Sequence, residues 1–200
     1  MTEFRKRYTK EYLAEIKKIL DSIEEDLVNK VDKLASILTK ARESKKTIFT
    51  MGNGGSATTA SHIAQDIAKC TIAEGLPRFK AIALTDSIPS MLAWANDASY
   101  EEIFIEQLKN LMEPGDVVIG ISGSGNSMNV IKAIEYANSN GGLTIGLSGY
   151  DGGKLLKCAQ ENVHIPSSHM QRVEDIHLLI GHLLISSIKE EQEQNRNHSE

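Results

Sequence analysis

His62 and Asp66 are the residues whose types and spacing best suit acid–base chemistry. They stand four positions apart, so on a helix they would project from one face and meet. An imidazole and a carboxylate can transfer protons or supply nitrogen and oxygen ligands to a metal ion. Alone, the pair is equally compatible with an exposed ion pair. The loop "GNGGS" (Gly52–Ser56) just before it favours a functional role.

A second group of titratable residues lies near the C-terminus, in "RVEDIHLLIGHLL" (Arg172–Leu184). On a straight helix, Glu174 and His182 would lie about 12 Å apart along the axis, from a rise of roughly 1.5 Å per residue. They could share one ion only if Glu174 lies at an irregular helix start or comes from another subunit. A histidine on a helix face is more often packed than reactive, which makes His177 the weakest candidate.

Two glycine-serine loops, "GNGGS" and "SGSGNS" (Ser122–Ser127), each follow an apolar run and precede a helix-forming segment. Backbone N–H groups and hydroxyls at such places can hold an anion. Neither loop is a Walker A motif or a dinucleotide-binding turn, so we predict a cradle for the monophosphate of a phosphorylated sugar. Each loop alone could equally be a turn or a helix cap. The predicted ligand contacts are Asn53, Gly54, Gly55, Ser56, Ser122, Gly123, Ser124 and Ser127.

The elements that must position these residues alternate between strands and helices. We expect strands at Lys46–Met51, Lys80–Leu84, Asp116–Ser122, Leu143–Ser148 and Asn162–Pro166. Helix-forming segments lie between them, at Ala57–Ile72, Ser87–Ala95, Tyr100–Leu111, Ser127–Asn138 and Gly152–Ala159. This order predicts an α/β fold, a doubly wound, Rossmann-like parallel sheet of five strands flanked by helices.

We expect one domain over residues 1–200. Residues 1–44 would form a long N-terminal helical arm, because apolar residues recur at three- and four-residue steps from Lys10 to Ser44. The apolar stripe of this arm could cover the protein's own sheet or a second subunit. Residues 45–190 would hold the α/β core and a C-terminal helix, and the polar tail 191–200 would be disordered.

Composition narrows the possible partners and the compartment. The chain has 22 basic and 27 acidic residues, and it lacks a block of Lys or Arg that could follow a nucleic acid backbone. No stretch approaches the ~18 apolar residues that cross a bilayer, and the N-terminus is charged. Cys70 and Cys158 lie far apart, as expected of two reduced core thiols. We therefore expect a cytoplasmic protein without direct nucleic acid or membrane contacts.

Four stretches of the chain resemble the sugar isomerase (SIS) domain family, and within it the phosphoheptose isomerase branch. They are "GNGGSA…SH" (Gly52–His62), "ND" (Asn96–Asp97), "GISGSGNSMNVIKAI" (Gly120–Ile134) and Arg172–Leu184. The resemblance implies an aldose–ketose isomerase that converts sedoheptulose 7-phosphate to D-glycero-D-manno-heptose 7-phosphate through an enediol. It also implies a role in heptose biosynthesis for surface polysaccharide, and a homotetramer with active sites between subunits.

The resemblance also assigns roles to individual residues. It implies that Asp66 and His182 are catalytic, that Asn96 and Asp97 contact sugar hydroxyls, and that Glu174 contacts the substrate. It further implies Zn²⁺, with ligands drawn from His62, Asp66, Glu174 and His182. The chain departs from the family at two of these positions, with Asp66 in place of Glu and Glu174 in place of Gln. Which of the two carboxylates abstracts the proton therefore stays open.

Other functions stay open beside the isomerase. Relatives with an SIS domain include non-catalytic adaptors that bind the replication initiator protein, and such a binding surface is not visible in a sequence. The departures at positions 66 and 174 also leave room for an isomerase of another ketose phosphate. A sugar-phosphate-sensing regulator is disfavoured, because the N-terminal arm has no readable helix-turn-helix.

Overall fold

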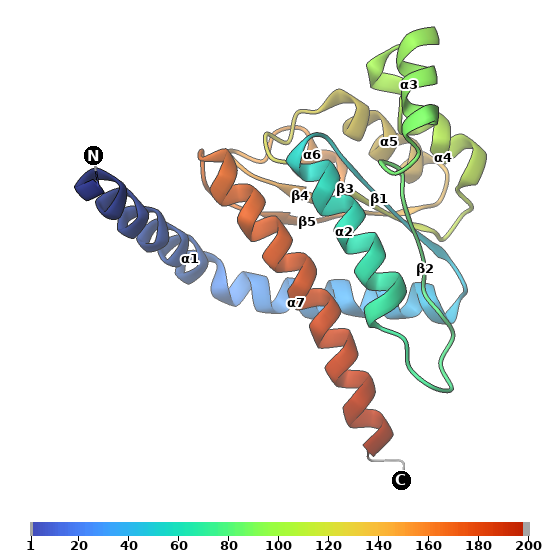
Figure 1. The fold of residues 1–200 in the computed structure, drawn as a ribbon. Helices are drawn as coiled ribbons and strands as arrows, with labels where there is room; N and C mark the ends of the chain where they lie inside the picture. The colour runs from blue at the N-terminus through green and yellow to red at the C-terminus, as the bar shows by residue number, and fades with distance from the viewer. Residues whose placement is uncertain (1, 198–200) are drawn as a thin grey trace.

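One parallel sheet organises the molecule (Figure 1). The computed structural model describes residues 2–197. Every neighbouring pair of strands is parallel, and the strand order is β2-β1-β3-β4-β5. The strands are β1 (Thr47–Gly52), β2 (Lys80–Ala83), β3 (Val117–Ser122), β4 (Leu143–Ser148) and β5 (Glu161–His164). The predicted α/β fold with a five-stranded parallel sheet is confirmed.

Helices cover both faces of the sheet, and the side chains of successive strand residues point to opposite faces. Ile48 of β1 packs into the core beneath the α1, α2 and α7 helices, whereas Phe49 packs against α4, α5 and α6 on the opposite face. The central strand β3 is buried along its whole length and is accordingly a continuous apolar run, VVIGIS. The edge strands β2 and β5 are less completely buried and carry polar residues. The helices are α1 (Thr2–Glu43), α2 (Gly55–Cys70), α3 (Ile88–Asp97), the 3-10 turn η1 (Tyr100–Glu102), α4 (Ile105–Leu111), α5 (Met128–Ser139), α6 (Leu155–Cys158) and α7 (Met170–Asn197).

The strand order places both glycine-serine loops at one point of the sheet. From β1 the chain moves outward to β2, then crosses back to β3 on the other side of β1. Ligands of open parallel sheets bind beyond the carboxyl ends of the strands where the strand order reverses. The loops after β1 and β3 flank this reversal, since Gly52 pairs with Ile121 at the ends of these two strands.

Two expectations from the sequence are wrong. Residues 191–197 of the tail continue α7 instead of being disordered, and residues 198–200 lie outside the described part of the chain. The segment is rich in good helix formers, the Lys189 ammonium lies 3.7 Å from the Glu193 carboxylate, and the preceding turn is anchored by buried Ile188. Cys70 is exposed at the end of α2, so it is a free thiol but not a core one.

No helix within residues 2–197 is both long and apolar enough to cross a membrane.

Candidate active site

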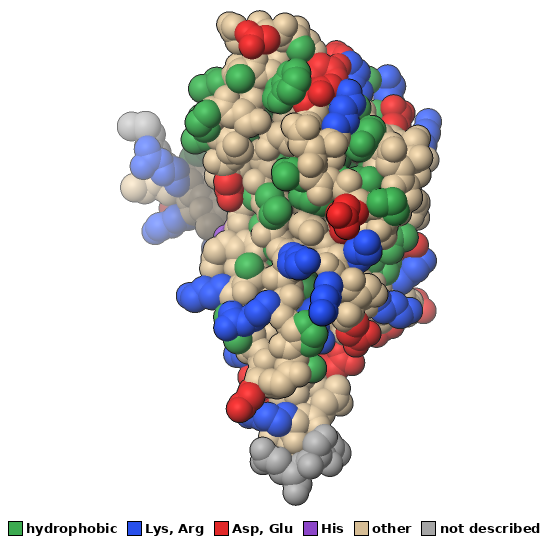
Figure 2. Space-filling view, turned by 90° about the vertical axis from the view of Figure 1, so that its right-hand side faces the viewer, with side chains coloured by type: hydrophobic (Ala, Val, Ile, Leu, Met, Phe, Trp, Pro, Cys, Tyr) green, Lys and Arg blue, Asp and Glu red, His purple; other side chains and the backbone are tan. Residues whose placement is uncertain are grey.

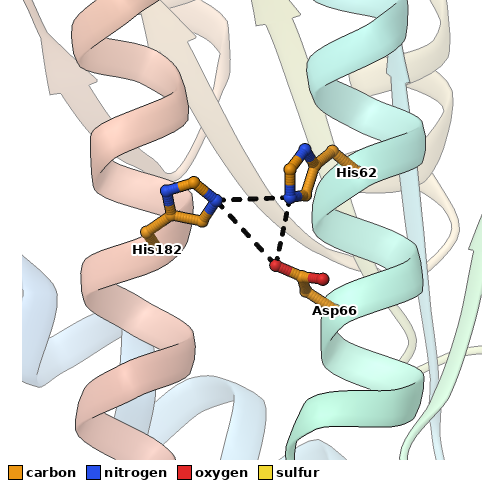
Figure 3. A group of neighbouring side chains, drawn as sticks. All are labelled: His62, Asp66 and His182. Carbon is orange, nitrogen blue, oxygen red and sulfur yellow. Dashed lines mark hydrogen bonds and ion pairs between the residues drawn. The ribbon is translucent and has the colours of Figure 1, made fainter.

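His62, Asp66 and His182 come together between the neighbouring helices α2 and α7 (Figure 3). The Nε2 atoms of the two histidines are 3.2 Å apart. Asp66 Oδ2 lies 3.3 Å from His62 Nε2 and 4.0 Å from His182 Nε2. The close packing of Gly181 on Ile63 allows the approach of the helices, because a Cβ at position 181 would come within 2.7 Å of the Ile63 side chain.

The chemistry of this group suits a divalent metal ion. Its three ligand atoms all lie within 4.8 Å of one another, and they are two imidazole nitrogens and one carboxylate oxygen. Ligand atoms about 2.0–2.1 Å from a tetrahedral zinc ion would lie about 3.3–3.4 Å from one another. The shortest separations in the group, 3.2 and 3.3 Å, match this spacing. Both histidine side chains are nearly half exposed, so the group is open to solvent.

Glu174 does not join this group within one chain. It lies two turns before His182 on α7, and its carboxylate packs against Gly55 at the start of α2. A Cβ on Gly55 would collide with that carboxylate. Of the four predicted metal ligands, the structure therefore brings three together and places the fourth at the glycine-serine loop.

The "SGSGNS" loop is closed on itself by its own serines. The hydroxyls of Ser122 and Ser127 are 2.9 Å apart, and the Asn126 N–H donates to the Ser124 hydroxyl at 3.2 Å. Gly123 packs under the Met170 sulfur at the start of α7, where a Cβ would not fit. Gly125 has φ of +67° and also leaves no space for a Cβ. The loop is thus a rigid turn that keeps hydroxyls together at the carboxyl edge of the sheet.

The "GNGGS" loop opens α2 directly. Gly54, with φ of +55°, lets the chain turn sharply, and the helix begins at Gly55 with Ser56 buried behind it. No side-chain oxygen within the described residues caps this helix start. The N–H groups of Ser56 and Ala57 donate to the Asn53 and Gly54 carbonyls, each at 3.0 Å, so the loop closes tightly onto the helix start. The N-terminal end of the helix still carries a partial positive charge, which favours an anion.

Asn53 connects the two loops through Asn129, a residue that sequence reasoning missed. Each amide donates to the oxygen of the other at 2.9 Å, so Asn53 of the first loop is paired with the first turn of α5. The Tyr100 hydroxyl also donates to Asn53 Oδ1, at 2.8 Å. The signal available in the sequence was the polar Asn129 among apolar residues just after the second loop. Tyr100 carried no signal, because only the tertiary fold brings η1 to the loop that follows β1.

The remaining predicted residues lie outside the histidine–aspartate group. Asn96 and Asp97 end α3, both exposed, and the Asn96 amide donates to the Asp97 carboxylate at 2.7 Å. His177 is fully buried, in agreement with the expectation of a packed histidine. Burial lowers the pKa of its ring to about 4, and its Nε2–H donates to the Ser148 carbonyl at 3.2 Å.

The chain is similar over most of its length to proteins named phosphoheptose isomerase. A phosphoheptose isomerase of a Nitratiruptor species is 38% identical over 185 residues, which cover 89% of this chain and 95% of that protein. The solved phosphoheptose isomerase of Neisseria gonorrhoeae is 29% identical, with a TM-score of 0.85 and coverage of 92% of this chain and 98% of that one. The Francisella tularensis phosphoheptose isomerase structure is 25% identical, with a TM-score of 0.86 and coverage of 95% and 100%.

A family model described as "SIS domain" matches residues 11–149, which include both glycine-serine loops and the His62–Asp66 pair. The match covers well over half of the chain, and the Nitratiruptor relative extends the similarity beyond it, over 89% of the chain. The chain therefore belongs to the SIS domain family.

Proposed function

We propose that this protein is a phosphoheptose isomerase that converts sedoheptulose 7-phosphate to D-glycero-D-manno-heptose 7-phosphate. The observation that carries the proposal is the meeting of His62, Asp66 and His182 at one point between α2 and α7. The names of the relatives support the substrate class. The product would enter heptose biosynthesis for surface polysaccharide, and the two free cysteines suit a cytoplasmic enzyme.

The reaction moves one proton between neighbouring carbons. A base removes a proton from C1 of the ketose while the C2 carbonyl oxygen gains one, which gives an enediol. A proton then returns to C2 and the O1 hydroxyl loses its own, so that the aldose forms with no net change in atoms or charge. Asp66 and His182 are the proposed base and acid. Because Asp66 Oδ2 and His182 Nε2 are 4.0 Å apart, both can reach the same pair of carbons.

The phosphate would lie in the two loops, away from the reacting carbons. Ser124 and the Ser122–Ser127 pair offer hydroxyls, and the N-terminal end of α2 offers a partial positive charge. Binding energy from this remote group would hold the sugar chain in place for proton transfer.

His62, Asp66 and His182 would hold a Zn²⁺ ion, and Asp66 and His182 would transfer protons only when their Oδ2 and Nε2 atoms are released from it. When bound, the ion supplies a Lewis acid that polarises the substrate carbonyl. The protein's own part is to orient the ligands, and the placement of Glu174 beside Gly55 leaves it to act on the substrate or across a subunit boundary.

We also propose self-association as a homotetramer. Exposed apolar side chains occur on α3, where Ile88 and Leu92 are 58% and 64% exposed. Figure 2 shows apolar side chains over the upper part of the molecular surface that it draws. On α1, Val28 is 65% exposed beside a groove that α1 shares with Leu183 of α7. Exposed apolar surface of this kind marks interaction sites, and Leu183 is adjacent to His182.

His182→Ala tests the proposed chemistry. We expect the folded variant to lose turnover of sedoheptulose 7-phosphate by at least about 100-fold, because it lacks one of the two proton-transfer groups. Affinity for the sugar phosphate should persist, since the loops are intact. Turnover is measured by aldose formation and affinity by calorimetry, with Ser186→Ala, an exposed change on the same helix, as the matched control.

Two further measurements complete the test: turnover after treatment with a chelator, and turnover of a panel of ketose phosphates. Removal of bound metal should lower turnover of the parent protein, and re-addition of Zn²⁺ should restore it. Unchanged turnover in His182→Ala would refute the assigned role. Turnover of pentulose or hexulose phosphates alone would favour another ketose phosphate, and binding of the replication initiator without any turnover would favour an adaptor.

A further inference from the structure

We propose that Tyr100 is a specificity residue that accepts a hydrogen bond from a hydroxyl on the sugar chain of the substrate, and that Asn129 positions it through Asn53. This inference rests on the proposed function, because it assumes that a phosphosugar enters the site. Its basis is a series of hydrogen bonds from Val130 to Tyr100. The donor and the acceptor of each bond follow from the first one, in which a backbone N–H can only donate.

The first hydrogen bond of the series has a backbone N–H as its donor. The Val130 N–H, which can only donate, bonds to Asn129 Oδ1 at 2.9 Å. This contact identifies the Asn129 oxygen and so fixes the amide orientation. The Asn53 Nδ2 must then donate to Asn129 Oδ1, and Asn129 Nδ2 must donate to Asn53 Oδ1, both at 2.9 Å. Asn129 is only 2% exposed, so water does not compete for these bonds.

The last hydrogen bond of the series involves the phenol hydroxyl of Tyr100. Asn53 Oδ1 can only accept, so the Tyr100 hydroxyl must use its single proton to donate to it, at 2.8 Å. The Tyr100 oxygen is left as an acceptor only. Tyr100 is 59% exposed as a residue, so it stands at the surface beside the loop, where a ligand can approach its oxygen. A sugar hydroxyl can donate to it, whereas the oxygens of a phosphate dianion cannot, and Tyr100 therefore distinguishes the polyol part of a substrate from its phosphate.

The backbone that carries Tyr100 is also held in place. Lys132 of α5 forms ion pairs with the next two residues, Glu101 and Glu102, each at 2.7 Å. These hydrogen bonds raise the pKa of Lys132 to about 12. Since Asn129 lies on the same helix one turn earlier, α5 fixes both ends of the network. An acceptor held in this way needs little reordering when a ligand binds.

Tyr100→Phe is the first test, because it removes the hydroxyl and keeps the ring. Binding is measured by calorimetry in a His182→Ala background, which removes turnover and leaves the loops intact. We expect the dissociation constant for sedoheptulose 7-phosphate to rise about three- to tenfold, as for one lost hydrogen bond, and that for inorganic phosphate to stay unchanged. Tyr8→Phe, which alters an exposed tyrosine on α1, is the matched control and should change neither.

Asn129→Asp tests the positioning role. A carboxylate still accepts from Val130 N–H and Asn53 Nδ2, but its second oxygen repels Asn53 Oδ1, so Asn53 must shift and its contact with Tyr100 is lost. Adding Tyr100→Phe to this variant should then have no further effect on sugar phosphate affinity. A purely structural role of Asn129 predicts additive losses instead, which would overturn the positioning role.

The results separate this proposal from the proposed function. If Tyr100→Phe weakens inorganic phosphate and sugar phosphate equally, or weakens neither, the specificity role is refuted. If the parent protein binds sedoheptulose 7-phosphate but does not turn it over, the isomerase proposal fails while the Tyr100 comparison still decides this one. Should Asn129→Asp not fold, the single Tyr100→Phe comparison decides alone.

Discussion

Asp66 is one methylene shorter than the glutamate that the resemblance to phosphoheptose isomerases implies at this position. The structure nonetheless brings its Oδ2 atom to 3.3 Å from His62 Nε2 and 4.0 Å from His182 Nε2. The side chain is only 15% exposed, so the surrounding helices restrict its movement. The shorter carboxylate therefore reaches both histidines, while the longer Glu174 carboxylate lies at the loop.

His177 predicts a pH dependence of stability. Burial lowers the pKa of the folded ring to about 4, whereas an unfolded histidine has its ordinary value near 6.5. The unfolded chain thus binds the extra proton first, and stability should fall as pH drops from about 6.5 to about 4, by about 3 kcal/mol in all. Urea unfolding measured across this range should show the loss.

A His177→Gln variant checks the assignment, because glutamine can still donate to the Ser148 carbonyl but does not titrate. The fall in its unfolding free energy between pH 6.5 and pH 4 should be smaller than that of the parent by about the same 3 kcal/mol. An equally steep fall in both proteins would show that groups other than His177 cause it.

At the scale of elements, α7 contributes side chains both to the glycine-serine loop and to the histidine–aspartate group. Glu174 in its second turn packs against Gly55 at the start of α2, and His182 two turns later reaches His62. Glu174 and His182 are too far apart along α7 to bind one ion within a single chain. Each therefore contacts a different part of α2, Glu174 at its start and His182 farther along.

Gly55→Ala tests this packing. The added methyl would meet the Glu174 carboxylate, and we expect a loss of unfolding free energy of about 1–3 kcal/mol, as for an overpacked site. In a Glu174→Ala background the same substitution should cost much less, because the obstructing carboxylate is gone. Urea unfolding of the four proteins gives the coupling energy. Purely additive costs would mean that Glu174 does not lie against Gly55 in solution.

At the scale of the whole molecule, α1 is only partly covered. Ile23 and Leu27 are buried in the core with α7, and the Tyr12 hydroxyl donates to the Asp175 carboxylate at 2.5 Å. Phe4 and Leu13, by contrast, are 61% and 62% exposed. Figure 1 shows the N-terminal part of α1 projecting beyond the sheet. Such an arm suits contact with a second copy of the chain.

Val28→Asp tests self-association. Val28 is 65% exposed, so the change should leave the fold of one chain intact, yet it would place a charge in an apolar interface. We expect the parent to have the mass of a tetramer by light scattering and the variant to have a smaller one. Lys18→Asp, an exposed change elsewhere on α1, serves as the control for charge. An equal mass for parent and Val28→Asp would exclude this part of α1 from the interface.

The sequence by itself determined the order of strands and helices, the two glycine-serine loops and the i, i+4 spacing of His62 and Asp66. It could do so because hydrophobic periodicity, glycine-rich turns and i, i+4 spacing are local properties of the chain. The helical end at residues 191–197 was missed because a polar composition is also compatible with a solvated helix once its preceding turn is anchored.

Only the tertiary structure decided which side chains meet. His62 and His182 are 120 residues apart in the chain, and their Nε2 atoms meet at 3.2 Å because α2 and α7 pack closely on the same face of the sheet. The partners of Asn53 were likewise invisible, since Asn129 and Tyr100 reach it from elements that follow other strands. Pairings of this kind depend on how helices cross and how far each side chain reaches, and no local pattern in a single sequence encodes them.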